Sequence, residues 1–185
     1  MVDITGHIAF GLLFAVFAWF VWDRRAAATF VGLAVIASLL PDIDLWLTKL
    51  FPAEFHHHGV THTVLFAVLA SVVGGALVAW LLAGPIDDWV ESERFDRKSL
   101  FVFSTGAFLA GSLSHLVADM LSAPDISTPI EPFWPFFDKP WSVDLVWYNA
   151  FWINFGFIAV MILVHLALAY YSDPGDHRYR MSTSK

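Results

Sequence analysis

Five long apolar segments, separated by polar connections, are the feature that most restricts what this chain can fold into. They cover approximately residues 4–22, 26–41, 63–84, 99–121 and 145–171. A helix needs about 20 apolar residues to cross the hydrocarbon core of a bilayer. The composition agrees, since 58% of the residues are hydrophobic and only 15% are charged. We therefore predict an all-α membrane bundle of about five transmembrane helices, as one domain over residues 1–171 with a polar tail at 172–185.

The basic residues are distributed unevenly over the connections between these segments. Only Lys49 and Lys139 lie in the loops 42–62 and 122–144. Because cytoplasmic loops carry the excess of Lys and Arg, we predict a protein of the cell membrane with its N-terminus and these two loops outside and its C-terminus in the cytoplasm. The other basic residues all fall on the predicted cytoplasmic side: Arg24, Arg25, Arg94, Arg97, Lys98, Arg178, Arg180 and Lys185.

Charge and cysteine content limit the partners and cofactors of the chain. Its net charge is −7 and it has no basic patch, so we predict no nucleic-acid partner. The sequence contains no cysteine, which excludes disulfides and thiolate ligands. Any bound metal must therefore be held by imidazole nitrogen and carboxylate oxygen.

Histidine and aspartate residues gather at the segment ends that the predicted topology places outside. A charged or imidazole side chain at membrane depth costs on the order of 2 to 3 kcal/mol, so it requires a partner or a function. Four segment ends converge there, and together they predict one site at the outer membrane interface. Their residues are His7, Asp42, Asp44, His56, His57, His58, His62, His115 and Asp119.

Each of these groups, taken alone, also has a purely structural interpretation. His115 and Asp119 are spaced to grip one ion from one helix face, but such pairs are more often hydrogen-bonded helix contacts. The run Pro41-Asp42-Ile43-Asp44 stops a helix and can equally be a cap or a solvated turn. The consecutive histidines can form a polar interfacial loop, which is the interpretation we favour for His56.

Other features of the sequence are predicted to be structural. Thr5 and Thr61 are placed to cap the first and third segments. The small residues Ala107 and Gly111 would let a neighbouring helix approach closely. His165 lies toward the cytoplasmic end of the fifth segment, where we expect a packed or interfacial side chain.

Considered jointly, the His and Asp groups favour a bound metal, because four independent segment ends would rarely carry them on one side by chance. A ligand set of nitrogen and oxygen without sulfur suits zinc, with manganese and iron as alternatives.

Five short motifs follow one another along the chain: Thr5-Gly6-His7, Pro41-Asp42-Ile43-Asp44, His57-His58-Gly59-Val60-Thr61-His62, His115-Leu116-Val117-Ala118-Asp119 and Pro132-Phe133-Trp134-Pro135-Phe136. This ordered set resembles the YdjM-type family of predicted membrane-bound metal-dependent hydrolases. The resemblance extends from residue 5 to about residue 136. It departs from the family at His58, where the family's motif has arginine.

A more distant resemblance is to the zinc-dependent phospholipase C and nuclease P1 group, helical enzymes that cleave phosphoesters with a zinc cluster. The similarity implies that Asp42, His62, His115 and Asp119 surround one metal. It also implies that His7 and a bridging Asp119 serve a second. Nothing after Asp119 supplies the third zinc site of that group, so one or two ions are expected.

These resemblances imply a metal-dependent hydrolase that attacks a phosphoester or related ester with water activated by the metal. Asp44 is then expected to hold that water or to support a ligand, and His57 to steady the leaving group. A site at the headgroup level favours membrane lipid or another small molecule as substrate. The alternatives are a structural metal site and a transporter of metal or anion, although transporters bind near the membrane midplane. The oligomeric state is left open.

Overall fold

The protein is described here from a computed structural model that covers residues 2–91 and 95–172. Within these residues it contains helices and no strand, which confirms the all-α prediction. Its helices are α1 (Ile4–Ala15), α2 (Ala18–Val21), α3 (Arg24–Ala37), α4 (Asp44–Leu50), α5 (Val64–Leu81), α6 (Ala83–Val90), α7 (Arg97–Leu121) and α8 (Ile158–Tyr171). Short 3₁₀ turns form at Pro41–Ile43 and Val60–His62, and a π-helical segment, Trp152–Phe157, leads into α8.

Five helical stretches of the described chain are long and apolar enough to cross a membrane, as predicted. They are Ile4–Val21, Arg24–Leu50, Val64–Leu81, Arg97–Leu121 and Trp152–Tyr171. The predicted tail at 172–185 lies almost entirely outside the described residues.

Three predicted boundaries are wrong. Residues 44–50 form α4 rather than loop, because the mostly apolar run after Asp44 continues the helical path from the turn at Pro41–Ile43. Residues 83–90 form α6, although the sequence at 85–98 reads as a charged loop. The fifth span begins at Trp152 instead of 145, because the backbone near Leu145 is held against the end of α7 by a hydrogen bond from its amide to the Leu121 carbonyl (2.9 Å).

The predicted helix caps are also wrong at both threonines. Asp3 caps α1, where its carboxylate accepts a hydrogen bond from the amide of Ile4. Thr63 caps α5 by accepting from the amide of Phe66 at 3.1 Å. Because a 3₁₀ turn precedes α5, the true cap falls two residues after Thr61, and Thr61 is free to bond a site carboxylate instead.

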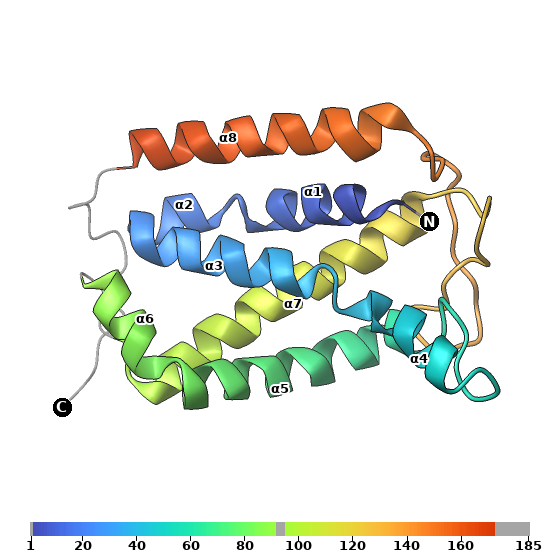
Figure 1. Cartoon of the computed structure of the whole chain (residues 1–185), viewed down its shortest axis with the longest axis horizontal. Coiled ribbons are helices and arrows are strands. Elements are labelled where there is room, and N and C mark those ends of the chain that lie inside the picture. The colour runs from blue at the N-terminus through green and yellow to red at the C-terminus, as the bar shows by residue number, and fades with distance from the viewer. Residues whose placement is uncertain (1, 92–94, 173–185) are drawn as a thin grey trace.

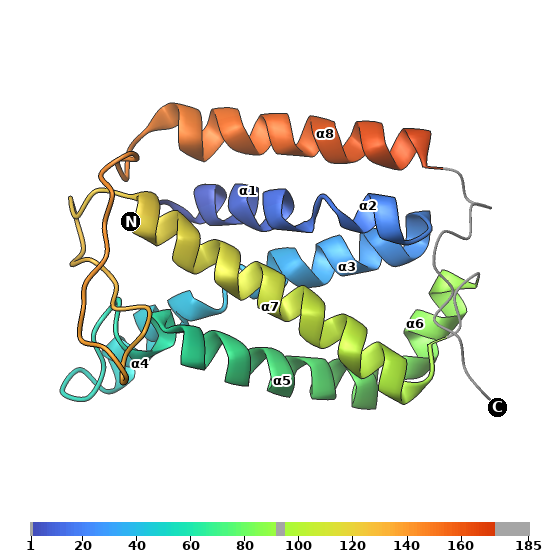
Figure 2. The ribbon, with the colours of Figure 1, turned by 180° about the vertical axis from the view of Figure 1, so that it is seen from behind.

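Helix α7 is the central element of the bundle and contacts α1, α3 and α5. Figures 1 and 2 show it running obliquely across the other helices, from the α6 end to the end where the N-terminus lies. Small residues allow this crossing, as the sequence predicts for Gly111. A Cβ atom at Gly111 would overlap the carbonyl oxygen of Ala34 and lie 2.8 Å from the Cβ of Ala37.

Gly111→Ala is therefore expected to lower the free energy of unfolding by about 1–3 kcal/mol, the usual cost of overpacking. Unfolding in detergent micelles, followed by circular dichroism, would measure it. Gly106→Ala on the same helix is the matched control, because the added Cβ would meet only Phe30, at 3.9 Å. That variant should be neutral or slightly more stable, given the better helix propensity of alanine. Equal losses in both variants would contradict the close α3–α7 contact.

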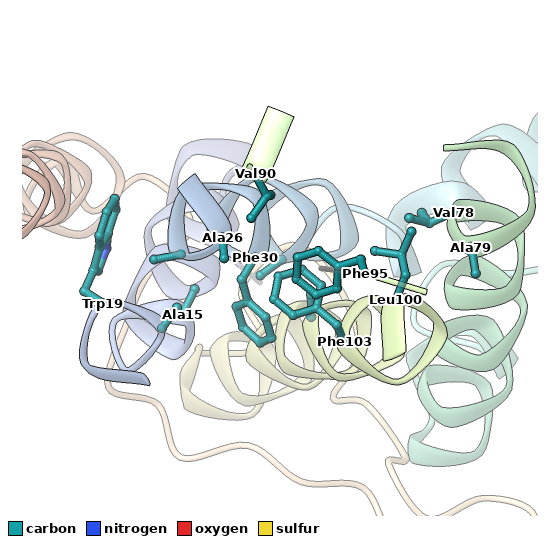
Figure 3. Close-up of a cluster of buried hydrophobic side chains, with 14 residues drawn as sticks. Ala15, Trp19, Ala26, Phe30, Val78, Ala79, Val90, Phe95, Leu100 and Phe103 are labelled. Atoms are coloured by element: carbon teal, nitrogen blue, oxygen red, sulfur yellow. The ribbon is translucent and has the colours of Figure 1, made fainter. Parts of the chain in front are cut away.

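The largest of the three apolar clusters in the described residues lies at the α6 end of the bundle. Figure 3 shows Trp19, Phe30, Phe103 and neighbouring side chains gathered between the helices there. Aromatic rings pack edge to face in this cluster, with the Phe30 and Phe103 centroids 5.5 Å apart. The opposite end, by contrast, buries the histidines and aspartates.

His165 hydrogen-bonds helix α8 to the rest of the bundle. Its side chain is buried, as predicted for a packed residue. Its Nδ1 accepts a hydrogen bond from the indole nitrogen of Trp19 at 2.7 Å, and its Nε2 donates to the Leu12 carbonyl at 3.0 Å. That carbonyl needs a donor because the amide of Val16 bonds Leu13 instead. His165 thus has a structural role at a break between α1 and α2.

The two ends of the bundle provide a test of orientation. Ala53 lies exposed in the loop after α4, and Asp88 lies exposed on α6 at the other end. If the positive-inside rule holds, Ala53→Cys will react with an impermeant thiol reagent in intact cells and Asp88→Cys only after lysis. The absence of native cysteine keeps the background clean. Labelling of Asp88→Cys alone in intact cells would reverse the proposed topology.

Candidate metal centre

The His and Asp residues that the sequence places at four segment ends meet inside the bundle. Helix α1 contributes His7, the turn at Pro41–Ile43 and the start of α4 contribute two aspartates, and α7 contributes His115 and Asp119. The segment between α4 and α5 contributes three histidines. Most of these side chains are buried, and their nitrogen and oxygen atoms form several groups close enough to hold a metal ion.

Four donor atoms, from Asp42, His62, His115 and Asp119, lie close together. His115 Nε2 lies 3.1 Å from both His62 Nε2 and Asp119 Oδ2. Asp42 Oδ1 lies 3.5 Å from each of the two imidazole Nε2 atoms, and His62 Nε2 lies 3.6 Å from Asp119 Oδ2. Ligands bound to zinc at about 2.0–2.1 Å in a tetrahedron would be about 3.4 Å apart. The Asp42, His62 and His115 atoms therefore form a group that fits one ion, and Asp119 Oδ2 lies close enough to the two imidazole nitrogens to join them.

Unpartnered buried atoms support the same interpretation. Burying a polar atom without a hydrogen bond costs on the order of 1 to 3 kcal/mol, and more for a charge. Asp119 is almost fully buried, yet neither of its oxygens has a hydrogen-bond partner. Asp42 Oδ1 and both nitrogens of His7 are in the same condition. A cation would compensate the carboxylate oxygens and His7 Nε2 together, because they lie near one another without a hydrogen-bond donor.

Outer hydrogen bonds orient the two imidazole ligands. His115 Nδ1 lies 2.7 Å from the Ser38 carbonyl, which fixes that nitrogen as the donor. His62 Nδ1 lies 3.1 Å from Asp44 Oδ2. Both rings thereby present Nε2 to the common centre, the arrangement in which a carbonyl or carboxylate sets the tautomer of a metal-bound histidine.

Asp44 lies behind this donor set rather than in it. Its Oδ1 bonds His57 Nδ1 at 2.9 Å, while its Oδ2 accepts from the Thr61 hydroxyl at 2.9 Å and from the His58 amide at 3.2 Å. Of the two roles predicted for Asp44, this geometry favours support of a ligand over holding water. It also places Asp44 and His57, the two predicted catalytic residues, in direct contact.

His7 lies beside the four donors and not among them. Its ring stacks on that of His115 with centroids 3.7 Å apart, and its Nε2 lies 3.6 Å from Asp119 Oδ1. Asp119 thus directs one oxygen to the four-atom set and the other to His7. This is the placement expected of a carboxylate that bridges two metal positions.

His58 belongs to the predicted His and Asp cluster, but the sequence does not assign it as a metal ligand. The sequence marks it as a departure from the family motif, but the ring is buried, with Nδ1 bonded to the Thr128 carbonyl. Its Nε2 has no hydrogen-bond partner and lies 3.8 Å from Asp119 Oδ2. A left-handed backbone conformation (φ 64°) turns the side chain inward. The only signal in the sequence was its place in the histidine run, whereas His56 is exposed, as expected of a loop residue.

The pKa values of the two buried loop histidines, His58 and His62, shift in opposite directions. Burial lowers the pKa of His58 to about 4 despite the nearby Asp119 carboxylate, so its Nε2 is unprotonated and available to a metal. Burial also opposes charge on His62, but the carboxylates of Asp42 and Asp44 beside its ring nitrogens outweigh it and raise the pKa to about 9. A metal bound at His62 must therefore displace a proton.

Two cavities border the centre. The larger, about 590 Å³, is reached past the loops and is lined by Asp44 and His58 together with Glu54, Glu131 and Trp134. The smaller, about 350 Å³, is apolar except for Asp42. Both lie within or near the usual range of 300–1,000 Å³ for small-molecule sites.

Comparison with known proteins gives one match. A family model described as YdjM inner membrane protein matches residues 1–177, which confirms the family resemblance seen in the motifs. No curated protein and no solved structure matches the chain. The distant similarity to the phospholipase C and nuclease P1 group therefore stays a prediction.

Proposed function

Because the chain belongs to the YdjM inner membrane protein family and buries His and Asp groups that can hold a metal ion, we propose that it is a membrane-bound metal-dependent hydrolase. The proposed substrate class is a phosphoester or related ester at the outer membrane interface. Zinc is the proposed ion, and manganese and iron suit the same nitrogen and oxygen donors.

The observation that carries this proposal is a surplus of donors. A structural zinc site closes around its ion with four ligands, whereas a catalytic site keeps a coordination position open. Beyond the four atoms of Asp42, His62, His115 and Asp119, further unpartnered atoms are offered by His7, His58 and the second oxygen of Asp119. A second ion held by these few donors would retain open positions, which favours catalysis over a structural site.

The proposed roles of the chain's residues follow from the contacts. A bound zinc ion would supply acidity, since it lowers the pKa of coordinated water from about 15.7 to about 7. Asp44 positions two rings, His62 as a ligand and His57 as a proton carrier. Hydrolysis places the hydroxyl of water on phosphorus or carbonyl carbon and returns a proton to the departing oxygen. His57 is the group proposed to deliver that proton.

A screen of ester classes tests the proposal. Purified protein in detergent micelles would be loaded separately with zinc, manganese or iron and assayed on a phosphodiester, a phosphomonoester, a phospholipid and a carboxylic ester. The expected result is metal-dependent hydrolysis of at least one phosphoester. Protein that carries metal but hydrolyses none of these substrates would favour a structural metal site and refute the hydrolase.

A further inference from the structure

An apolar groove opens beside the candidate metal centre on the membrane side of the bundle. This membrane-side groove is the 350 Å³ cavity lined by Ile4, Asp42 and the apolar side chains between Ile36 and Trp46. Its rim belongs to two membrane-spanning stretches, Ile4–Val21 and Arg24–Leu50. Ile36 and Trp46 are 63% and 68% exposed, so in a bilayer they face lipid. Tryptophan at this position is typical of the headgroup level.

The groove meets the metal centre at Asp42. The side chains of His7, His62, His115 and Asp119 have no exposed surface, and that of His58 has 2%. Asp42 is the exception among the donors, with 11% of its side chain exposed. Its Oδ1 is buried toward the other donors, while the residue itself lines the groove. Asp42 is therefore the most accessible of the described donors, and its exposed part faces the apolar membrane-side groove.

The larger cavity is a poor entrance for an anionic ester. It carries the carboxylates of Asp44, Glu54 and Glu131, which repel a phosphate group. It also touches the centre through Asp44 and His58, of which only His58 offers an unpartnered donor atom. The membrane-side groove carries one carboxylate, which the metal would neutralise.

We propose that the membrane-side groove binds the acyl chain of a membrane phospholipid and so presents its phosphoester to the metal at Asp42. The inference rests on the proposed hydrolase function and specifies its substrate class. Lipid already covers Ile36 and Trp46 in the bilayer, so a chain enters the groove without crossing water.

Photolabelling tests the groove without relying on catalysis. The protein would be reconstituted in dioleoylphosphatidylglycerol vesicles containing a small fraction of an analogue with a diazirine in one acyl chain. After illumination, labelled peptides are identified by mass spectrometry. We expect residues 36–46 to be labelled severalfold more than residues 64–81, which also expose apolar side chains to lipid. Ile36→Trp, which fills the groove from an exposed position, should remove the difference.

Hydrolysis rates provide a second test of the acyl-chain site. The ratio of the rate on phosphatidylglycerol to the rate on the soluble diester bis(p-nitrophenyl) phosphate should fall on the order of tenfold or more in Ile36→Trp. Leu69→Trp, at a similarly exposed position on α5, should leave the ratio unchanged.

The outcomes separate the two proposals. Equal labelling of residues 36–46 and 64–81, or an unchanged rate ratio in Ile36→Trp, would overturn the acyl-chain site. If the wild-type protein hydrolyses none of the substrates in the ester screen, the hydrolase proposal fails, and the photolabelling result alone decides whether the groove binds a lipid chain.

Discussion

Asp119→Ala is expected to abolish stoichiometric metal binding. Its two oxygens face both the four-donor set and His7, so its loss removes a ligand from each proposed position. His115→Ala should have nearly the same effect, because its Nε2 lies within 3.5 Å of three other donors. We expect a decrease in affinity of at least about 100-fold, since a direct ligand matters more than an outer-shell partner. Inductively coupled plasma mass spectrometry of purified protein would measure the metal content.

The control for these variants is His56→Ala. His56 lies in the same histidine run but is exposed. Among the described contacts, its side chain hydrogen-bonds only the carbonyl of His57. Its replacement should leave metal content unchanged, as should that of His165, whose nitrogens bond Trp19 and Leu12. Full metal occupancy in Asp119→Ala would refute the ligand assignment. Equal loss in all four variants would indicate unfolding instead.

Asp44→Asn is expected to reduce hydrolysis on the order of 100-fold while the protein keeps most of its metal under saturating zinc. The asparagine side chain has one acceptor oxygen, whereas Asp44 uses two, one for His57 and one for His62. His57 then loses its fixed orientation, although the four donor atoms stay in place. Steady-state rates on the substrate found by the ester screen, with metal content measured in parallel, would show the effect.

Asp88→Asn on α6 is the matched control for this change, because Asp88 is an exposed aspartate at the opposite end of the bundle. It should hydrolyse at the wild-type rate. An Asp44→Asn protein that is stable, metallated and as active as its parent would eliminate the proposed Asp44–His57 pair.

The sequence predicts the spans well because bilayer thickness sets a length that apolar runs must meet. It fails at α4 and α6, where local charge suggests loops. Asp42, in the turn before α4, and Asp44, at the start of α4, have partners far away in the chain. His62 Nε2 lies 3.5 Å from Asp42 Oδ1, and the Thr61 hydroxyl donates to Asp44 at 2.9 Å. These tertiary contacts, rather than local propensity, allow carboxylates to lie in a helical segment inside the bundle.

The sequence predicts which residues gather at the site from their type and position. It does not predict which of them act as ligands and which support a ligand. Asp42 and Asp44 are equivalent in the sequence, two residues apart in one motif. In the structure one is directed at the other donors and the other lies behind His62. His57 and His58 are distinguished in the same way, by a left-handed residue that reverses the chain direction. No periodicity signals such a turn, so the sequence does not assign His58 as a ligand.

The central claim is that the buried His and Asp side chains bind a metal that hydrolysis requires. The most direct test measures hydrolysis by one preparation of wild-type protein before chelation, after metal removal and after zinc is returned. The account predicts that the rate falls at least about 100-fold on metal removal and recovers with one or two equivalents of zinc, while Asp119→Ala does not recover. A rate that is unchanged after complete metal removal would contradict it.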